Sequence, residues 1–289
     1  MLNIKRILLP VDFPIASLGV IHQAATLARH FHSEISMLHV VPALKRAAGA
    51  PEDKGELAGG DLLTAIIREA QKREDESLGS ELDGITVRGM SIKGDPAWAI
   101  VRAAEEEKAD LIMMPSRGFT FEQFLLGSVS GKALHRTERP VWTGAHIEVS
   151  TVDKFAIRNV LCAVDLGPRS DVAMAWAVPM AATFGARLTL VHVTAGVELW
   201  GPGGAYVSQE WRQALVDDAS ERIARLQRDM DVKADVFIGS GDLPKALRQA
   251  VTQTNADLLV TGCNPYDGHL RRTHGYGIIC AVPIPVLNV

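Results

Sequence analysis

Short apolar runs alternate with longer amphipathic stretches along the whole chain. The runs Ile7–Val11 and Leu111–Met114 are continuous, as expected for strands of a parallel sheet that is buried on both faces. Between such runs, residues 17–31 carry apolar side chains at helical spacing, which predicts an amphipathic helix. The same patterns predict further strands at 35–41, 85–92 and 140–147, and further helices at 61–82, from Asp95-Pro96 onward and at 127–136.

The pattern of the first half returns in the second half. The segment Ile4–Asp12 resembles Ile157–Asp165 at an offset of 153 residues. Farther along, Gly94-Asp95 matches Gly241-Asp242 at an offset of 147 residues. Matches that keep their order over such lengths indicate one α/β unit written twice, with a polar link near 148–155.

The order of strands and helices predicts the topology of each copy. Because crossover connections between parallel strands are right-handed, alternating strands and helices form a doubly wound sheet. We therefore expect an α/β fold with two tandem domains, residues 1–150 and 151–289. Each should hold a five-stranded parallel sheet in the order 3-2-1-4-5, flanked by helices.

The composition of the chain indicates which binding partners are not expected. Hydrophobic residues make up 47% of the chain, enough for a normal core in each half, and the formal net charge is −4. Without a basic excess, nucleic acid is not an expected partner. No apolar run approaches the roughly 20 residues that span a bilayer, and the N-terminal stretch lacks the apolar core of a signal peptide. Three cysteines without metal-binding spacing fit a reducing compartment, so we expect a cytoplasmic protein away from membranes.

Candidate binding residues follow the first and fourth strands of copy one. Ligands of doubly wound sheets bind at the carboxyl ends of the strands, beside the point where the strand order reverses. Asp12 follows the first strand, where it can accept a hydrogen bond from a ligand or cap the next helix. The segments 115–118 and 127–130 combine glycines, serines and Arg117, which can surround a phosphate with N–H, hydroxyl and guanidinium donors. The same residues also suit a structural turn with a helix cap, and Asp165 occupies the place of Asp12 in copy two.

Several short motifs together resemble the universal stress protein family over nearly all of both halves. They are Pro-Val-Asp-Phe, Leu-His-Val, Gly-Asp-Pro, Ala-Asp-Leu-Ile-Met-Met, Ser-Arg-Gly, Leu-Leu-Gly-Ser-Val-Ser and Arg-Pro-Val. The resemblance implies binding of ATP or a related adenine nucleotide such as ADP or AMP, with Mg²⁺ as a candidate companion ion. It places Asp12 and the backbone of Val40 at the adenine and ribose, and the later loop at the phosphates. The nucleotide site implied for copy one comprises Pro10, Val11, Asp12, Val40, Met114, Pro115, Ser116, Arg117, Gly118, Gly127, Ser128, Val129 and Ser130.

Both copies depart from the family pattern of Gly-x-x-Gly, nine residues, then Gly-Ser or Gly-Thr. In copy one, Pro115 replaces the first glycine, which removes an N–H donor, and the intervening loop has eight residues. In copy two, Gly262 is kept, but Arg272-Thr273 stands where Gly-Ser is expected. We therefore expect a degenerate, structural second copy. The residues His269, Arg271, Arg272 and His274 form an alternative candidate anion site there.

No standard catalytic motif occurs in the chain, which favours a stress-response protein that binds a nucleotide without catalysis or with very slow turnover. The alternative is a tandem scaffold or interaction protein that binds no nucleotide. An adenine-nucleotide hydrolase is a third alternative, although its usual Ser-Gly-Gly phosphate loop is missing. Family resemblance also implies pairing through the last strand. Here we expect that pairing between the two copies of one chain, near Val141 and Val286, with a homodimer as a further alternative.

Overall fold

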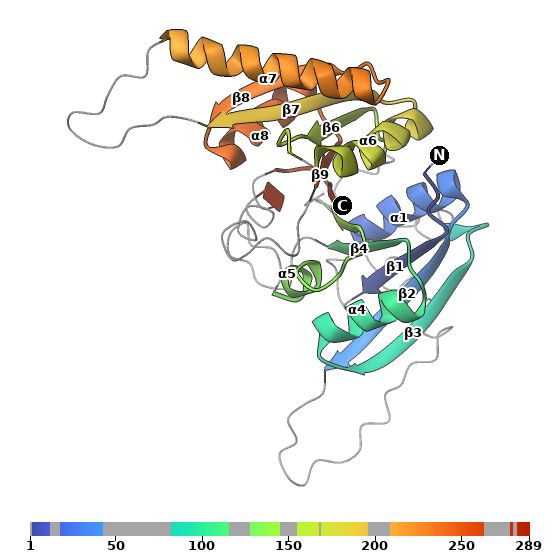
Figure 1. Ribbon diagram of the computed structural model, residues 1–289. Coiled ribbons are helices and arrows are strands. Elements are labelled where there is room, and N and C mark those ends of the chain that lie inside the picture. The colour runs from blue at the N-terminus through green and yellow to red at the C-terminus, as the bar shows by residue number, and fades with distance from the viewer. Residues whose placement is uncertain are drawn as a thin grey trace, which may run out of the picture. The chain divides into compact units, whose positions relative to one another are not determined.

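The structure is a computed structural model that describes residues 2–11, 18–42, 82–115, 128–144, 155–167, 169–195, 209–262, 278–279 and 282–289. These residues fall into two compact units (Figure 1). The first is Asn3–Ala156, and the second consists almost wholly of Ile157–Val289.

The first unit is a parallel five-stranded sheet with helices against it (Figure 1). Its strands pair in the order β3-β2-β1-β4-β5, as the sequence predicts. Its elements are β1 (Arg6–Val11), α1 (Leu18–Phe31), β2 (Glu34–Pro42), β3 (Val87–Gly94), α4 (Pro96–Glu106), β4 (Leu111–Pro115), α5 (Ser128–Leu134) and β5 (Val141–Gly144). Of the helix expected at 61–82, residues up to 81 lie outside the described ranges.

The second unit repeats this topology. Its strands pair in parallel in the order β8-β7-β6-β9-β10, which is again 3-2-1-4-5 along the chain. The predicted fold class is therefore confirmed. The elements are β6 (Asn159–Ala163), α6 (Ser170–Phe184), β7 (Arg187–Ala195), α7 (Gln209–Asp229), β8 (Asp235–Gly241), α8 (Leu243–Thr254), β9 (Leu258–Thr261) and β10 (Val286–Asn288).

The apolar runs form the centre of each sheet because both of their faces are covered. In β1, Ile7, Leu8 and Leu9 are completely buried, and β4 is equally buried at Leu111 and Ile112. Helix α1 adds a stripe at helical spacing, which comprises Ile21, Ala24, Ala25, Leu27 and Ala28. Burying such side chains stabilises a domain by roughly 1.5–3 kcal/mol for each large aliphatic residue. The packed core thus fixes the positions of the strand ends, where the candidate site residues lie.

In both copies, an aspartate before the fourth strand is hydrogen-bonded to the backbone at the start of the first strand. In copy one, Asp110 Oδ2 accepts hydrogen bonds from the backbone N–H groups of Lys5 and Arg6, at 2.8 and 2.9 Å. In copy two, Asp257 Oδ2 accepts from the two residues at the matching positions, both at 2.8 Å. One carboxylate oxygen therefore fixes the edge of each sheet, and the repeat extends to individual hydrogen bonds.

A polar contact at the sheet edge distinguishes the first copy. The indole Nε1 of the completely buried Trp142 donates to Gln23 Oε1 at 2.6 Å, which joins β5 to α1. At the matching positions copy two has Leu287 on β10 and Trp176 on α6. Because Leu287 has no polar side-chain group, this hydrogen bond has no counterpart between those two positions. The two copies therefore place different side chains at the same contact between the last strand and the first helix.

None of the helices within the described ranges could span a lipid bilayer.

Candidate functional site

The strand order of the first unit reverses between β1 and β4. From β1 the chain passes through α1 to β2 on one side, and from β3 it passes through α4 to β4 on the other side. The carboxyl ends of β1 and β4 are Val11 and Pro115, on two strands paired with Ile7 beside Leu111. Doubly wound sheets bind ligands at such an edge because loops diverge there and leave a crevice.

The described candidates at this edge come together from three strands. Pro10, Val11 and Met114 are buried, whereas Val40 and Pro115 are half-buried. Their apolar side chains belong to the core or its margin, so their backbone groups are what they can offer to a ligand. For Ser128 only the backbone is described, as the first residue of α5, and Val129 is half-buried. The candidates Asp12, Ser116, Arg117, Gly118 and Gly127 lie outside the described residues.

Ser130 connects the two ends of the glycine- and serine-containing segment. Its buried Oγ donates a hydrogen bond to the backbone oxygen of Pro115 at 3.1 Å. The first turn of α5 is therefore held against the end of β4, and the chain between them leaves and returns at the carboxyl edge of the sheet. In this arrangement the Ser130 hydroxyl proton is used by the protein's own backbone.

The paired histidines of the second strands are hydrogen-bonded to the ends of the first strands. His39 Nδ1 lies 3.4 Å from the backbone oxygen of Val11, and His192 Nδ1 lies 2.8 Å from that of Val164. Both rings are only half-buried. They serve the same contact in both copies, as expected for structural histidines rather than for a reactive group in one copy.

The corresponding edge of the second unit uses its acidic residue internally. Asp165 follows β6, and its Oδ1 accepts hydrogen bonds from Gly167 N–H at 2.8 Å and from Ser170 Oγ at 3.0 Å. The carboxylate thus fixes the turn that leads into α6. Gly262, which follows β9, also lies against this turn, because a Cβ atom at Gly262 would be only 3.1 Å from the backbone oxygen of Arg169.

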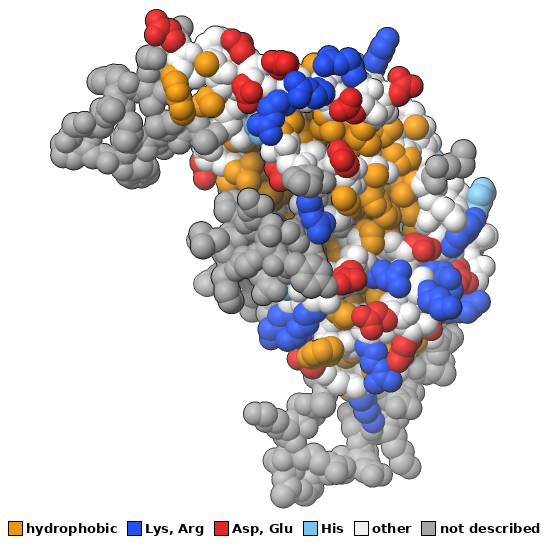
Figure 2. Space-filling view, viewed as in Figure 1, with side chains coloured by type: hydrophobic (Ala, Val, Ile, Leu, Met, Phe, Trp, Pro, Cys, Tyr) orange, Lys and Arg blue, Asp and Glu red, His pale blue; other side chains and the backbone are white. Residues whose placement is uncertain are grey.

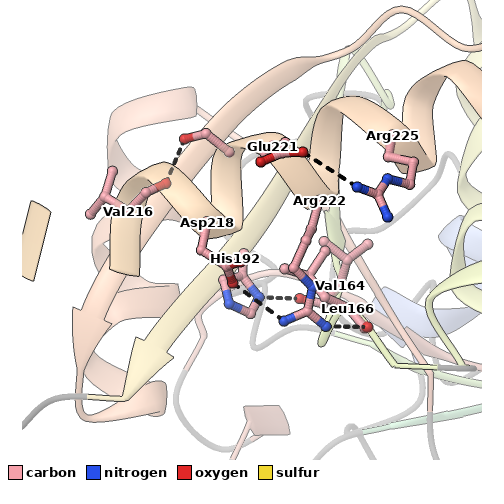
Figure 3. A network of polar contacts seen from close by, with 9 residues as sticks. Val164, Leu166, His192, Val216, Asp218, Glu221, Arg222 and Arg225 are labelled. Atoms are coloured by element: carbon pink, nitrogen blue, oxygen red, sulfur yellow. Dashed lines mark hydrogen bonds and ion pairs between the residues drawn. The ribbon is translucent and has the colours of Figure 1, made fainter. Parts of the chain in front are cut away.

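An arginine from α7 crosses to the same turn (Figure 3). Arg222 Nη2 donates to the backbone oxygen of Leu166 at 2.9 Å, and its Nη1 lies 3.6 Å from Asp218 Oδ2, one helical turn earlier. Figure 3 shows the guanidinium lying close to His192 and to the end of β6. We name Asp165, Leu166, Gly167, Ser170 and Arg222 the copy-two closure. Its internal contacts engage Asp165 Oδ1, the Gly167 N–H group, the Ser170 hydroxyl group and the Leu166 carbonyl group at this end of the sheet.

The sequence prediction did not identify Arg222. The only signal in the sequence is its spacing of four residues from Asp218, which is typical of an ordinary ion pair on a helix surface. The contact with Leu166 joins residues 56 positions apart, so only the folded unit brings them together. The charge of Arg222 alone carried no information about this role.

The described residues show no metal centre. Within those ranges, no three side chains of His, Cys, Asp or Glu come together in a way that could hold a metal ion. Cys162 lies in β6 with its side chain completely buried, and this burial raises the pKa of its thiol to about 12. A buried thiol that keeps its proton is a poor nucleophile and a poor metal ligand, which agrees with a role in the core.

Comparison with known proteins identifies one family in both halves. The model of the universal stress protein family matches residues 3–143 and 156–276. A universal stress protein of Methanocaldococcus jannaschii is 33% identical over 138 residues, which are 47% of this chain and 79% of the relative. The tandem matches agree with the duplication seen in the sequence and in the two sheets.

Two solved structures complete the comparison. A universal stress protein from Archaeoglobus fulgidus aligns with 99% of this chain and 96% of its own, with a TM-score of 0.66 and 24% identity, and this likeness concerns the fold. A universal stress protein in complex with cAMP aligns with 49% of this chain and 96% of its own at 22% identity. Its TM-score is 0.34, so its ligand gives no argument about this chain.

Proposed function

The chain belongs to the universal stress protein family, and we propose that its first copy binds ATP or a related adenine nucleotide without catalysis or with very slow turnover. The contact between Ser130 and Pro115 is the observation that carries this proposal. It anchors both ends of the segment that resembles the family's phosphate loop at the carboxyl edge of the sheet. That edge is where doubly wound sheets bind ligands.

The chemistry of the loop fits phosphate groups. Residues 116–127 contain one arginine and two glycines, and Ser128 follows them at the start of α5. Glycine allows backbone N–H groups to approach an anion closely, and a guanidinium adds paired charged donors. By family resemblance, Asp12 and the backbone of Val40 would meet the adenosine part, and Gly118, Gly127, Ser128, Val129 and Ser130 the phosphates. Ser130 would contribute its backbone N–H, because its hydroxyl group donates to Pro115.

The copy-two closure supports placing the nucleotide in copy one. Asp165 and the turn after β6 are bound to each other and to Arg222. A nucleotide that used Asp165 Oδ1 or the Leu166 carbonyl at the second edge would compete with these contacts. We therefore assign copy two a structural role.

Turnover is expected to be absent or very slow because the sequence contains no motif that would position a general base. Mg²⁺ is expected only as a companion of the nucleotide, held through water by Asp12. The stress-response role and the cytoplasmic location stay predictions that rest on the family resemblance and on composition.

Calorimetric titration of the full chain with ATP tests the proposal. We expect one nucleotide per chain. Gly127→Arg should abolish binding, because a long side chain would stand where the backbone must approach a phosphate. The sequence of copy two has an arginine, Arg272, at the aligned position. Circular dichroism of the variant should match that of the parent chain, so that lost binding is separated from lost folding.

A matched pair of substitutions tests the assignment to copy one. Asp12→Asn should weaken ATP binding about tenfold, because it removes the charge of an acceptor at the ribose, and a hydrogen bond to a charged group is worth roughly 1.5–3 kcal/mol. Asp165→Asn alters the equivalent residue in copy two and should leave the affinity within about twofold. The reverse result would place the nucleotide in copy two. No binding by the parent chain would contradict the proposal and favour a nucleotide-free tandem scaffold.

A further inference from the structure

A concave surface of the first unit lies where the strands begin, at the opposite end of the sheet from the proposed nucleotide. It is an open hollow of about 690 Å³, formed by the segments 5–6, 28–34 and 84–86 where β1, β2 and β3 begin. We name it the amino-edge hollow. The full length of the strands separates it from their carboxyl ends, so it is independent of the proposed nucleotide site.

Positive charge dominates the amino-edge hollow. Lys5, Arg6 and Arg29 line it, together with the imidazole of His32. Glu34 is the acidic residue among its lining residues, and its carboxylate is paired with Arg88 at 3.2 Å. In Figure 2, Lys and Arg side chains gather on the right of the view, where Figure 1 shows these three strands beginning.

The second unit provides an internal comparison with a different charge. At the same end of its sheet it has a hollow of about 560 Å³, at the start of β7 and β8. The residues that match Lys5 and Arg6 are Arg158 and Asn159, and they do not line this second hollow. Two cations, Arg187 and Lys233, line that hollow together with two carboxylates, Asp231 and Asp235. Its charges therefore balance, and Arg187 lies 4.0 Å from Asp235. Copy two keeps a positive charge at the position of Lys5, as Arg158, but has Asn159 and Ala182 at the positions of Arg6 and Arg29. The fold itself therefore does not require the positive charge at those two positions.

Ordinary structural roles explain only part of this charge. Arg29 lies in the last turn of α1, where a cation stabilises the carbonyl end of a helix. That reason does not apply to Lys5 and Arg6, which lie at the start of β1 and belong to no helix. Asp110 binds the backbone of Lys5 and Arg6, and Asp257 binds the backbone of the matching residues of copy two in the same way, so neither carboxylate accounts for the difference in charge.

We propose that the amino-edge hollow binds a small oxyanion with two or more negative charges, of the phosphate or polyphosphate class. Arg6 is the first residue of β1, Lys5 precedes it, and Arg29 lies near the end of α1, so the charged donors that line the hollow come from two separate segments of the chain. Thr86 adds a hydroxyl group at the rim. Arginine is well suited to this class of ligand because its planar group donates two parallel hydrogen bonds to a phosphate.

Titration with tripolyphosphate at low salt tests this site, in the Gly127→Arg background so that the nucleotide loop does not contribute. The double variant Lys5→Gln with Arg29→Gln should weaken binding at least tenfold. Both side chains are exposed, so the double variant should keep its fold, and its circular dichroism should match that of the parent chain. Its thermal unfolding midpoint should fall only by the small amount expected when a cation is removed from the last turn of a helix. Lys5→Gln alone, the milder change, should weaken binding about threefold.

The matched control is Arg187→Gln with Lys233→Gln in the hollow of the second unit, which removes the same number of positive charges. This variant should bind tripolyphosphate within twofold of its parent. Orthophosphate and ATP are titrated as well. Tighter binding of ATP than of tripolyphosphate would identify a nucleotide as the ligand, and equal binding would identify the phosphate chain alone. Both ligands belong to the proposed class. No binding by the parent, or equal losses in the two double variants, would overturn the proposal.

Discussion

Asp110 and Asp165 show what single carboxylates do at the ends of these strands. Asp110 holds the backbone at the start of β1, and Asp165 holds the turn that leads into α6. Each accepts hydrogen bonds from groups nearby in the fold, so neither needs a ligand to explain its position. Asp12 matches Asp165 in sequence, so its assignment to a nucleotide depends on the Asp12→Asn and Asp165→Asn comparison and not on residue type.

Cys162 gives a prediction at the scale of one side chain. Burial favours the neutral thiol and raises its pKa to about 12 from 9.0. The folded chain should therefore react extremely slowly with a thiol reagent at pH 8, and denatured chain rapidly. The measurement is the rate of thiol modification in a Cys263→Ser and Cys280→Ser background, with and without denaturant. Equal rates in both conditions would contradict the burial of this thiol.

The same pKa shift predicts the direction of a stability change with pH. Above pH 9 the unfolded chain loses this proton while the folded chain keeps it, so unfolding is favoured. The contribution of Cys162 to stability should be complete below about pH 9 and should decline as the pH rises toward 12. Cys162→Ala, compared with the parent over this window, isolates that contribution.

At the scale of elements, both copies begin the helix after the third strand in the same way. Asp95 Oδ1 accepts from Trp98 N–H at 3.0 Å, and Asp242 Oδ1 accepts from Lys245 N–H at 3.1 Å. In each case a glycine with positive φ comes immediately before the aspartate, with φ of 156° at Gly94 and 92° at Gly241. The pair Asp95-Pro96 predicted the first of these helix starts, and the structure shows the second at the matching aspartate of the repeat.

Removing the second of these caps should destabilise the chain. Asp242→Ala leaves the Lys245 N–H without its side-chain acceptor and should lower the free energy of unfolding by about 1 kcal/mol. Denaturant titration measures the change. Lys245→Ala is the matched control, because it keeps the N–H group and removes only a surface side chain. A loss of the same size in both variants would show that the cap is not the cause.

The ion pair between the starts of the second and third strands is reversed in sign between the copies. Glu34 and Arg88 lie 3.2 Å apart in copy one, and Arg187 and Asp235 lie 4.0 Å apart at the matching positions of copy two. The acidic and the basic residue have changed places between the two strands, so the pair stays attractive in both copies. This exchange indicates that the contact between these strand starts is attractive in both units.

A double substitution tests that indication. Glu34→Arg should destabilise the chain through repulsion from Arg88, and adding Arg88→Asp, which recreates the arrangement of copy two, should restore about 0.2–1 kcal/mol. Denaturant titration of the two single variants and the double variant gives the coupling. Additive effects in the double variant would mean that the two side chains do not interact.

At the scale of the whole molecule, the association of chains stays a prediction. If the last strands near Val141 and Val286 pair within one chain, neither is available to a second chain. The protein should then sediment with the mass of one chain, 31.2 kDa, at micromolar concentration. A stable dimer would favour the homodimer that the sequence also allowed.

Much of the architecture could be predicted because it depends on short-range patterns. Continuous apolar runs, helical spacing and the helix start at Asp95-Pro96 identified most described elements of copy one, although β3 begins at Val87 and not at Ile85. The candidate site was harder to predict from the sequence. Pro10, Val11 and Met114 were expected beside a ligand, and the structure shows their side chains buried. The sequence pattern does not distinguish a backbone that faces a crevice from a side chain that fills the core.

The amino-acid sequence by itself determined the duplication, the strand order of each copy and the family, because each follows from residue order and spacing. Only the tertiary structure decided how the polar groups are used. Ser130 is bound to Pro115, Arg222 to Leu166, and three cations line one hollow whose counterpart has balanced charges. These contacts join residues from different elements, and a hydrogen bond or a charge cluster depends on distances that exist only after the chain has folded.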